Sequence, residues 1–179
     1  MLARIVEGRE GVAVAGTSGK STVAGMIGFV LERLGADPLV INGAPVLNWM
    51  SAERIGNVRA GRSKWCVLEV DESDRSLLAF HPAWAVVTNV SADHFPLEES
   101  LELFRQFEAQ VANGVLWAEA EAEAQGFDPR LDASGSRFEW AGVPVRLNLP
   151  GRHNAENART AAAMCARLGF RPADVAAAL

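Results

Sequence analysis

The sequence predicts an α/β domain in which helices flank a mostly parallel sheet. Short apolar runs alternate along the chain with segments whose apolar residues recur at helical spacing. Several of these runs are apolar almost throughout, which is typical of parallel strands covered on both faces. With 179 residues, 49% of them hydrophobic and 22% charged, the composition is that of one globular domain. We therefore expect a single domain over residues 1–179.

The first strand and the first helix have the clearest patterns. Residues 11–16 form an apolar run that ends in glycine. Apolar residues then recur at helical spacing from Val23 to Leu34, and Gly35 follows as a helix stop. This order predicts a strand, a tight loop and a helix.

The middle of the chain repeats the alternation. Apolar residues at helical spacing between Leu97 and Val111 predict a helix. Four apolar runs around it predict strands over residues 38–41, 64–70, 84–89 and 114–117.

The last third has weaker signals. Residues 119–125 suit a short helix, and turn residues fill 126–135. Residues 138–147 predict a hairpin that turns near Gly142. Small apolar residues predict a helix that ends near Gly169, and another begins after Pro172.

Charge and hydropathy exclude several classes of protein. Seventeen basic against twenty-two acidic residues give a net charge of −5, and basic residues form no run, which argues against a duplex nucleic-acid binder. No apolar run is long enough to span a bilayer. Arg4, Glu7, Arg9 and Glu10 interrupt the stretch where a signal peptide would be apolar. We expect a cytoplasmic protein without membrane insertion.

The two cysteines lie far apart in apolar stretches. Cys66 falls in a predicted strand and Cys165 in a predicted helix. We expect two buried thiols, in preference to a disulfide or a metal pair.

A glycine-rich loop lies between the first strand and the first helix. Its sequence, GTSGKST over residues 16–22, carries one of only two lysines among seventeen basic residues. Glycines let the backbone approach phosphate oxygens, Lys20 can reach the terminal phosphates, and the Ser21 hydroxyl can bind Mg²⁺. The pattern favours nucleotide binding over the alternative, an ordinary glycine-rich turn.

Polar segments follow the next two buried strands. Residues 69–74 contain four carboxylates, and a carboxylate there suits Mg²⁺, although a solvated acidic loop is an equal alternative. Alternation along the strand does not decide which carboxylate faces the loop. Asn89, Asp93 and His94 follow the next strand, and the ends of parallel strands converge on one edge of a sheet. Imidazole is an unusual Mg²⁺ ligand, so His94 by itself suggests a polar network.

The segment GRHNAEN, residues 151–157, opens the last long helix. His153 or Asn154 can cap that helix without any ligand. Alternatively, the Asn154 amide can bind the edge of a purine.

Four motifs taken in order, GTSGKST, EVDESD, VVTNVSADH and LPGRHNAENA, resemble the central ATP-binding domain of the Mur ligases, which has a P-loop NTPase-like fold. EVDESD is most similar to the branch that adds L-alanine to UDP-N-acetylmuramate in peptidoglycan precursor synthesis. Other branches carbamylate a lysine after the DH motif, and no lysine follows Lys64 in this chain. That absence favours the L-alanine branch.

The resemblance implies an ATP-dependent, ADP-forming ligase in which a carboxylate attacks the γ-phosphate and an amine then displaces phosphate from the acyl phosphate. It implies ATP and Mg²⁺ as cofactors, with Lys20, Glu69 and His94 as catalytic residues and Ser21, Glu69 and His94 at the metal. The residues implied to bind the nucleotide are Gly16, Thr17, Ser18, Gly19, Lys20, Ser21, Thr22, Asn89, His153, Asn154 and Asn157. The last three are implied to lie on the adenine side.

Mur ligases also have an N-terminal UDP-sugar domain and a C-terminal amino-acid domain, and we expect neither in this chain. UDP-N-acetylmuramate and the amino acid are then partners only where those domains are supplied, and the isolated chain is expected to be inactive. Two alternatives are a non-catalytic nucleotide-binding paralogue or fragment, and an unrelated P-loop kinase or ATPase. An unrelated P-loop kinase or ATPase would explain the GRHN segment only as a chance occurrence.

Overall fold

A computed structural model describes residues 8–179, and its central element is a six-stranded sheet. The strand order is β3-β2-β4-β1-β5-β6. β3 is antiparallel to β2, and the other neighbouring pairs are parallel, which confirms the mostly parallel sheet. The strands are β1 Glu10–Ala15, β2 Leu39–Ile41, β3 Val58–Arg59, β4 Trp65–Glu69, β5 Trp84–Val87 and β6 Gly114–Trp117. Arg4 and Glu7, and with them the start of the domain expected over 1–179, lie outside the described residues.

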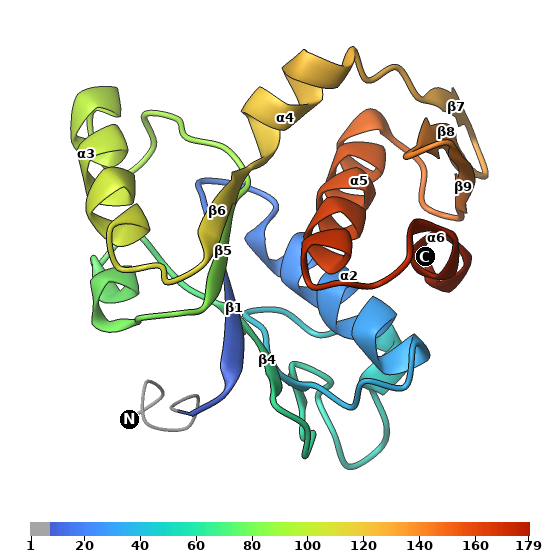
Figure 1. Cartoon of the computed structure of the whole chain (residues 1–179), viewed down its shortest axis with the longest axis horizontal. Helices are drawn as coiled ribbons and strands as arrows, with labels where there is room; N and C mark the ends of the chain where they lie inside the picture. The colour runs from blue at the N-terminus through green and yellow to red at the C-terminus, as the bar shows by residue number, and fades with distance from the viewer. Residues whose placement is uncertain (1–7) are drawn as a thin grey trace.

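Helices cover both faces of this sheet, as Figure 1 shows, with α3 on one side and α2 and α5 on the other. The helices are α2 Lys20–Arg33, α3 Leu97–Glu108, α4 Ala118–Gln125, α5 Arg152–Arg167 and α6 Pro172–Ala178, with short 3₁₀ turns η1 Leu47–Trp49 and η2 Ser76–Ala79. In the described part of the chain, no helix is long and apolar enough to cross a bilayer.

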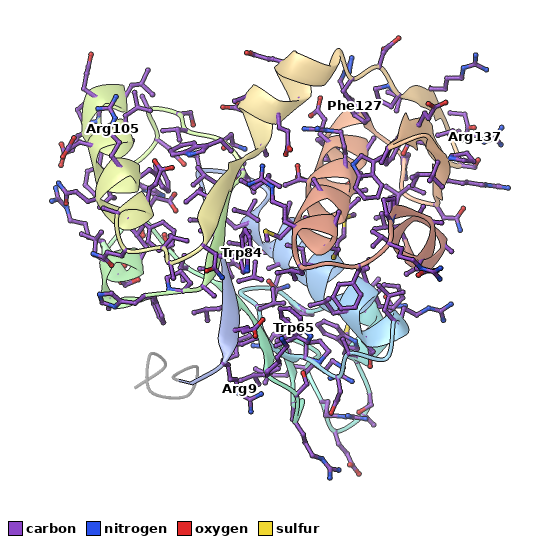
Figure 2. All side chains as sticks on the ribbon, in the orientation of Figure 1. Arg9, Trp65, Trp84, Arg105, Phe127 and Arg137 are labelled. Atoms are coloured by element: carbon purple, nitrogen blue, oxygen red, sulfur yellow. The ribbon has the colours of Figure 1, made fainter. Side chains whose placement is uncertain are left out.

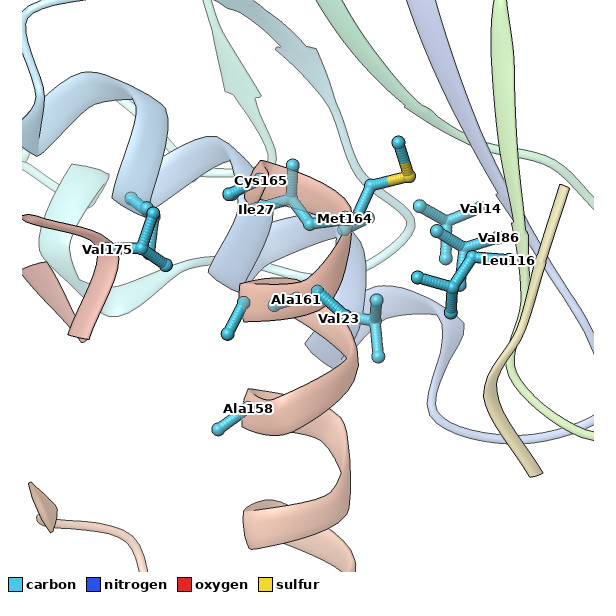
Figure 3. Packing of buried hydrophobic residues seen from close by; sticks show 14 of the residues in the cluster. Val14, Val23, Ile27, Val86, Leu116, Ala158, Ala161, Met164, Cys165 and Val175 are labelled. Atoms are coloured by element: carbon cyan, nitrogen blue, oxygen red, sulfur yellow. The ribbon is translucent and has the colours of Figure 1, made fainter. Parts of the chain in front are cut away.

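Alternation along the strands divides the core into two clusters. Val12 and Val14 of β1 pack into the cluster under α2 and α5, whereas Ala13 and Ala15 pack into the cluster under α3. Figure 3 shows the first cluster, in which side chains of both helices face the sheet: Val14, Val86 and Leu116 from the strands, and Val23, Ile27, Ala161 and Met164 from the helices. The small residues of α5 let that helix lie close against α2.

A second sheet of three antiparallel strands lies beside α5. Its strands are β7 Arg130–Asp132, β8 Gly135–Trp140 and β9 Val143–Leu147. The β8–β9 hairpin turns at Ala141 and Gly142, whose φ angles of 50° and 73° suit a tight two-residue turn, so the predicted hairpin is confirmed. Phe127, labelled in Figure 2, packs edge-on against Phe138 with ring centroids 5.2 Å apart. This contact ties the end of α4 to the second sheet.

Most predicted elements are present with shifted ends. α3 ends at Glu108, so the predicted extension to Val111 is wrong. β7 occupies residues that were expected to form turns, and β3 has only two residues and no pattern of its own. Cys66 and Cys165 are free and buried, as predicted, and burial raises the pKa of their thiols to about 11 and about 12.

Candidate functional site

The carboxyl ends of three neighbouring parallel strands form the edge of the sheet that carries the predicted site. Val14 of β1 lies opposite Glu69 of β4, and Ala15 lies opposite Val87 of β5. The segments that leave these strands therefore start side by side. This is the edge at which open α/β sheets bind their ligands.

The loop after β1 depends on two glycines with positive φ. Gly16 has a φ of +123°, and a Cβ placed on it would lie 2.2 Å from Thr88 Oγ1, so no other residue fits there. Gly19 has a φ of +80° and is the N-cap of α2, and no side chain among residues 8–179 caps that helix. The first backbone N–H groups of α2 are therefore available to an anion, as a phosphate site requires.

Asn89 holds this loop in place through its side chain. Its Nδ2 donates to the Ser18 carbonyl at 3.0 Å, and its Oδ1 accepts from the Ser18 N–H at 2.9 Å. The Asn89 carbonyl also accepts from the Thr17 N–H at 3.0 Å. The side chain of Asn89, predicted as a nucleotide ligand, is therefore hydrogen-bonded to the backbone of the loop.

Thr88 and Ser91, on either side of Asn89 in the segment after β5, also form hydrogen bonds with the loop. Thr88 Oγ1 donates to the Ser18 carbonyl at 2.7 Å, and the Ser91 N–H donates to Thr17 Oγ1 at 3.0 Å. Neither Thr88 nor Ser91 was singled out from the sequence. Their only sequence signal is their place beside Asn89, directly after a buried strand.

Ser21 and Glu69, two of the three predicted metal ligands, are in contact. The Ser21 hydroxyl donates to Glu69 Oε1 at 2.9 Å, and the Gly43 N–H donates to Glu69 Oε2 at 2.6 Å. A Cβ on Gly43 would lie 2.6 Å from Oε2, so the carboxylate fits closely over a glycine. A hydroxyl and a carboxylate held together are the oxygen donors that Mg²⁺ prefers, and this donor set fits that ion.

Lys20 lies over its own loop and pairs with Glu72. Its Nζ donates to the Gly16 carbonyl at 2.8 Å and lies 3.0 Å from Glu72 Oε2. The acidic stretch over residues 69–74 therefore supplies two carboxylates to the site, Glu69 to Ser21 and Glu72 to Lys20. Alternation along β4 does not decide which carboxylate faces the loop, and the structure shows that Glu69 and Glu72 both contact it.

Within residues 8–179, no hydrogen bond or ion pair joins His94, the third predicted metal ligand, to Ser21 or Glu69. The His94 side chain is half exposed, with Nε2 3.8 Å from Asp93 Oδ2. The pKa of Asp71 is lowered chiefly by the Ser73 backbone N–H, and the positive charge of Lys20 adds to the effect. Across residues 8–179, no three acidic, histidine or cysteine side chains gather as a ready metal-ligand cluster.

The start of α5 meets the loop through one residue. A Cβ on Gly19 would lie 2.8 Å from Asn157 Oδ1, so this carboxamide packs directly on the glycine. Asn154 Nδ2 donates to the Pro150 carbonyl at 2.7 Å, and His153 is exposed. The alternative that His153 or Asn154 caps the helix is wrong, because the N-cap is Gly151.

Thr22 lies in the first turn of α2. With Ser21 and Asn42 it lines a cavity of about 490 Å³ whose other walls are mostly apolar. Asn42 is buried, and its Nδ2 donates to the Ser21 carbonyl at 3.1 Å. The helix start is thus supported from β2 as well as from β5.

A family model of the Mur ligase middle domain matches residues 14–115, the stretch that contains the loop, Glu69, Glu72 and His94. The chain belongs to the Mur ligase middle domain family. The match begins within β1 and ends within β6, so it covers the strands whose ends form the site.

Curated relatives extend the similarity of this Mur ligase domain over the rest of the chain. The UDP-N-acetylmuramate–L-alanine ligase of Synechocystis sp. is 35% identical over 198 residues, which cover 95% of this chain and 38% of that protein. The ligase of the same name from Xylella fastidiosa is 33% identical, covering 100% and 44%. The Mur ligase chain therefore spans less than half the length of these relatives.

Solved structures agree with this assignment. UDP-N-acetylmuramate–alanine ligase from Thermotoga maritima superposes with a TM-score of 0.81 at 26% identity, over 98% of this chain and 45% of that one. A UDP-N-acetylmuramate:L-alanyl-γ-D-glutamyl-meso-diaminopimelate ligase from Neisseria meningitidis gives 0.80 at 21% identity over 98% of this chain and 66% of that one, a likeness of fold alone. The Mur ligase fold thus extends over nearly all of the chain.

Proposed function

We propose that this chain is the ATP- and Mg²⁺-binding core of an ADP-forming ligase that adds L-alanine to UDP-N-acetylmuramate in peptidoglycan precursor synthesis. The observation that carries the proposal is the uncapped start of α2, where two glycines with positive φ and Lys20 surround free backbone N–H groups. The names of the curated relatives support the choice of substrates. Because the reaction uses ATP, we place it in the cytoplasm.

The residues of the loop would act mainly by positioning the phosphates of the nucleotide and by offsetting their charge. Backbone N–H groups at the start of α2 bind the phosphates, and the ammonium of Lys20 offsets charge at the terminal phosphate. The substrate carboxylate attacks the γ-phosphorus, the bond to the β-phosphate oxygen breaks, and ADP leaves. The alanine amine then attacks the acyl carbon, loses a proton and expels inorganic phosphate. Stabilising charge on the transferring phosphoryl group is the main task of such a site.

Ser21 and Glu69 would hold Mg²⁺, with His94 as a further ligand on the strength of the family motif. The ion, when bound, neutralises charge on the phosphates. The oxygen pair is already assembled, since Gly43 and Ser21 fix the two oxygens of Glu69. The His94 side chain is half exposed and has no hydrogen bond or ion pair with that oxygen pair in the described part of the chain.

Asn157, Asn154 and His153 would bind the adenine side of the nucleotide. Asn157 already contacts Gly19 of the loop, so a ligand bound at the loop lies next to the start of α5. We propose that the outer domains of the family supply the sugar and the amino acid, and that the chain alone binds ATP without ligating. A non-catalytic paralogue with the same nucleotide site is the second candidate.

Calorimetric titration with Mg–ATP tests the nucleotide site. We expect binding by the unmodified chain and an affinity roughly 10- to 100-fold weaker in Lys20→Ala, because a charge-assisted hydrogen bond is worth about 1.5–3 kcal/mol. Lys64→Ala is the matched control, since Lys64 is the only other lysine and pairs with Glu10 near the other edge of the sheet. Equal affinities in the two variants would contradict the proposal.

A turnover assay separates the ligase from the paralogue. With the two outer domains of a relative added, we expect phosphate release that requires both UDP-N-acetylmuramate and L-alanine. Nucleotide binding without any such turnover favours the paralogue. Substrate-dependent phosphate release from the chain alone would contradict the proposed need for the outer domains.

A further inference from the structure

Glu72 is a buried carboxylate at the candidate site. The residue is 4% exposed, and both of its carboxylate oxygens accept from Lys20 Nζ, at 3.0 and 3.3 Å. A buried charge is costly unless it is paired, and the loss of one partner leaves the other uncompensated. Lys20 and Glu72 thus depend on each other for their position.

The backbone around Glu72 fixes where its side chain lies. The Val70 N–H donates to the Val14 carbonyl at 3.0 Å, which extends the β1–β4 pairing by one bond beyond Glu69. The Arg75 N–H then donates to the Glu72 carbonyl at 3.0 Å and closes a turn. Glu72 therefore sits on a short, hydrogen-bonded segment directly after a buried strand.

The acceptors around the Lys20 ammonium outnumber its hydrogens. Nζ has three hydrogens and lies 2.8 Å from the Gly16 carbonyl, 3.0 and 3.3 Å from the two Glu72 oxygens, and 3.5 Å from the Thr17 carbonyl. The ammonium can keep Gly16 and one Glu72 oxygen and still turn one N–H toward a phosphate at the loop. Glu72 does not have to leave for a nucleotide to bind.

Glu72 and Glu69 have separate tasks. Glu69 accepts from the Ser21 hydroxyl and the Gly43 N–H, whereas Glu72 contacts Lys20. Lysine carries its charge on a flexible four-carbon chain, and a free lysine would have to be ordered when the nucleotide binds. A buried carboxylate that orders it beforehand removes that cost.

We propose that Glu72 is a positioning residue that holds the Lys20 ammonium over the loop for the terminal phosphates of the nucleotide. The proposal rests on the proposed function, because it needs a triphosphate at this loop. It assigns to Glu72 a role in triphosphate affinity that acts through Lys20. AMP, which lacks the terminal phosphates, should not be affected.

Glu72→Gln tests the proposal, since it keeps the shape of the side chain and removes the charge. We expect Mg–ATP affinity to fall roughly threefold to tenfold, the cost of ordering one long side chain, while AMP affinity stays within about twofold. In a Lys20→Ala background the same change should have little effect, because the two residues act as a pair. Asp74→Asn is the matched control, an exposed carboxylate of the same segment that accepts from the Ser76 N–H.

Each result of these titrations supports or overturns the inference. Unchanged or tighter Mg–ATP binding in Glu72→Gln overturns it, and so does an equal loss for ATP and AMP, which would mean a structural role only. If Glu72→Gln fails to fold, Glu72→Asp keeps the charge but shortens the reach, and the same selective loss is expected. Failure of the unmodified chain to bind Mg–ATP overturns the proposed function together with this inference. Normal binding that depends on Lys20 but not on Glu72 overturns this inference alone.

Discussion

The proposed nucleotide site has two sides, a phosphate side at the loop after β1 and an adenine side at the start of α5, and they are built differently. On the phosphate side, residues 88–91 hold the loop through hydrogen bonds that join positions about seventy residues apart in sequence. On the adenine side, the side chain of Asn154 bonds the Pro150 carbonyl four residues away, and His153 is exposed. The first side is fixed by the sheet, whereas the second has, apart from the packing of Asn157 on Gly19, only local contacts at the start of one helix.

This difference indicates which part of the site exists before a ligand arrives. Interlocked backbone and side-chain bonds keep amide groups oriented, and preorganised dipoles need no rearrangement when charge is bound. The exposed side chains at the start of α5 retain freedom that a bound base would have to restrict. Substitutions on the phosphate side should therefore change both folding and binding, and those on the adenine side should change binding alone.

Gly16→Ala should have the largest effect on the free energy of unfolding. The new Cβ would lie 2.2 Å from Thr88 Oγ1 and 2.9 Å from the Asn89 carbonyl oxygen, at a φ of +123°. We expect a loss of about 3 kcal/mol or more in urea unfolding, together with loss of nucleotide binding, from strain and overpacking combined. Gly35→Ala is the control, since its φ is +75° but its Cβ would meet no atom within 4 Å. Equal losses in the two variants would mean that the closeness of Gly16 to Thr88 and Asn89 does not matter.

Asn89→Ala should have the next largest effect. It removes two hydrogen bonds to the Ser18 backbone while leaving the backbone bond to Thr17. We expect a loss of about 1–3 kcal/mol in unfolding free energy and weaker binding of inorganic tripolyphosphate, because the loop amides lose their orientation. Asn113→Ala, at an exposed asparagine just before β6, is the control for loss of an amide. Unchanged tripolyphosphate affinity in Asn89→Ala would show that the loop keeps its shape without this clamp.

The phosphate side was also the more predictable side from the sequence. Gly16, Lys20 and Ser21 belong to a contiguous motif between a strand and a helix, so local order alone specified their place. Parallel strands with similar apolar runs predicted that the segments after β4 and β5 would meet that motif. The registers of Val14 with Glu69 and of Ala15 with Val87 place the ends of β4 and β5 on either side of the end of β1.

What the sequence did not predict depends on contacts between distant residues. Glu72 reaches Lys20 across 52 positions, and whether it or a neighbouring carboxylate does so depends on how the chain turns after β4. Gly43 supports Glu69 from a segment without any motif. β3 and β7 have two and three residues and form by pairing with neighbours, so no periodicity within them could reveal them.

Asn157→Ala should have a smaller effect on unfolding free energy and on binding. Asn157 lies between the two sides and packs on one residue of the loop, Gly19. The substitution leaves the hydrogen bonds between the Asn89 side chain and the Ser18 backbone intact. We expect the unfolding free energy to change by less than about 1 kcal/mol and Mg–ATP affinity to fall roughly fivefold, the value of one hydrogen bond. Parallel titrations with tripolyphosphate should give a smaller loss. If tripolyphosphate binding falls as far as ATP binding, Asn157 belongs to the phosphate side.

His153→Ala should leave folding unchanged, and it gives the sharpest separation of the two sides. The side chain is exposed at the start of α5, so we expect the unfolding free energy to stay within about 0.5 kcal/mol of that of the unmodified chain. If this residue contacts the base, Mg–ATP affinity should fall roughly threefold to fivefold, because the loss of one aromatic contact costs about 1 kcal/mol, while tripolyphosphate affinity is unchanged. His81→Ala, at an exposed histidine just before β5, is the control. Because parallel strands begin at one edge of a sheet and end at the other, His81 lies away from the loop, and any effect shared by the two variants reflects the loss of a surface histidine in general.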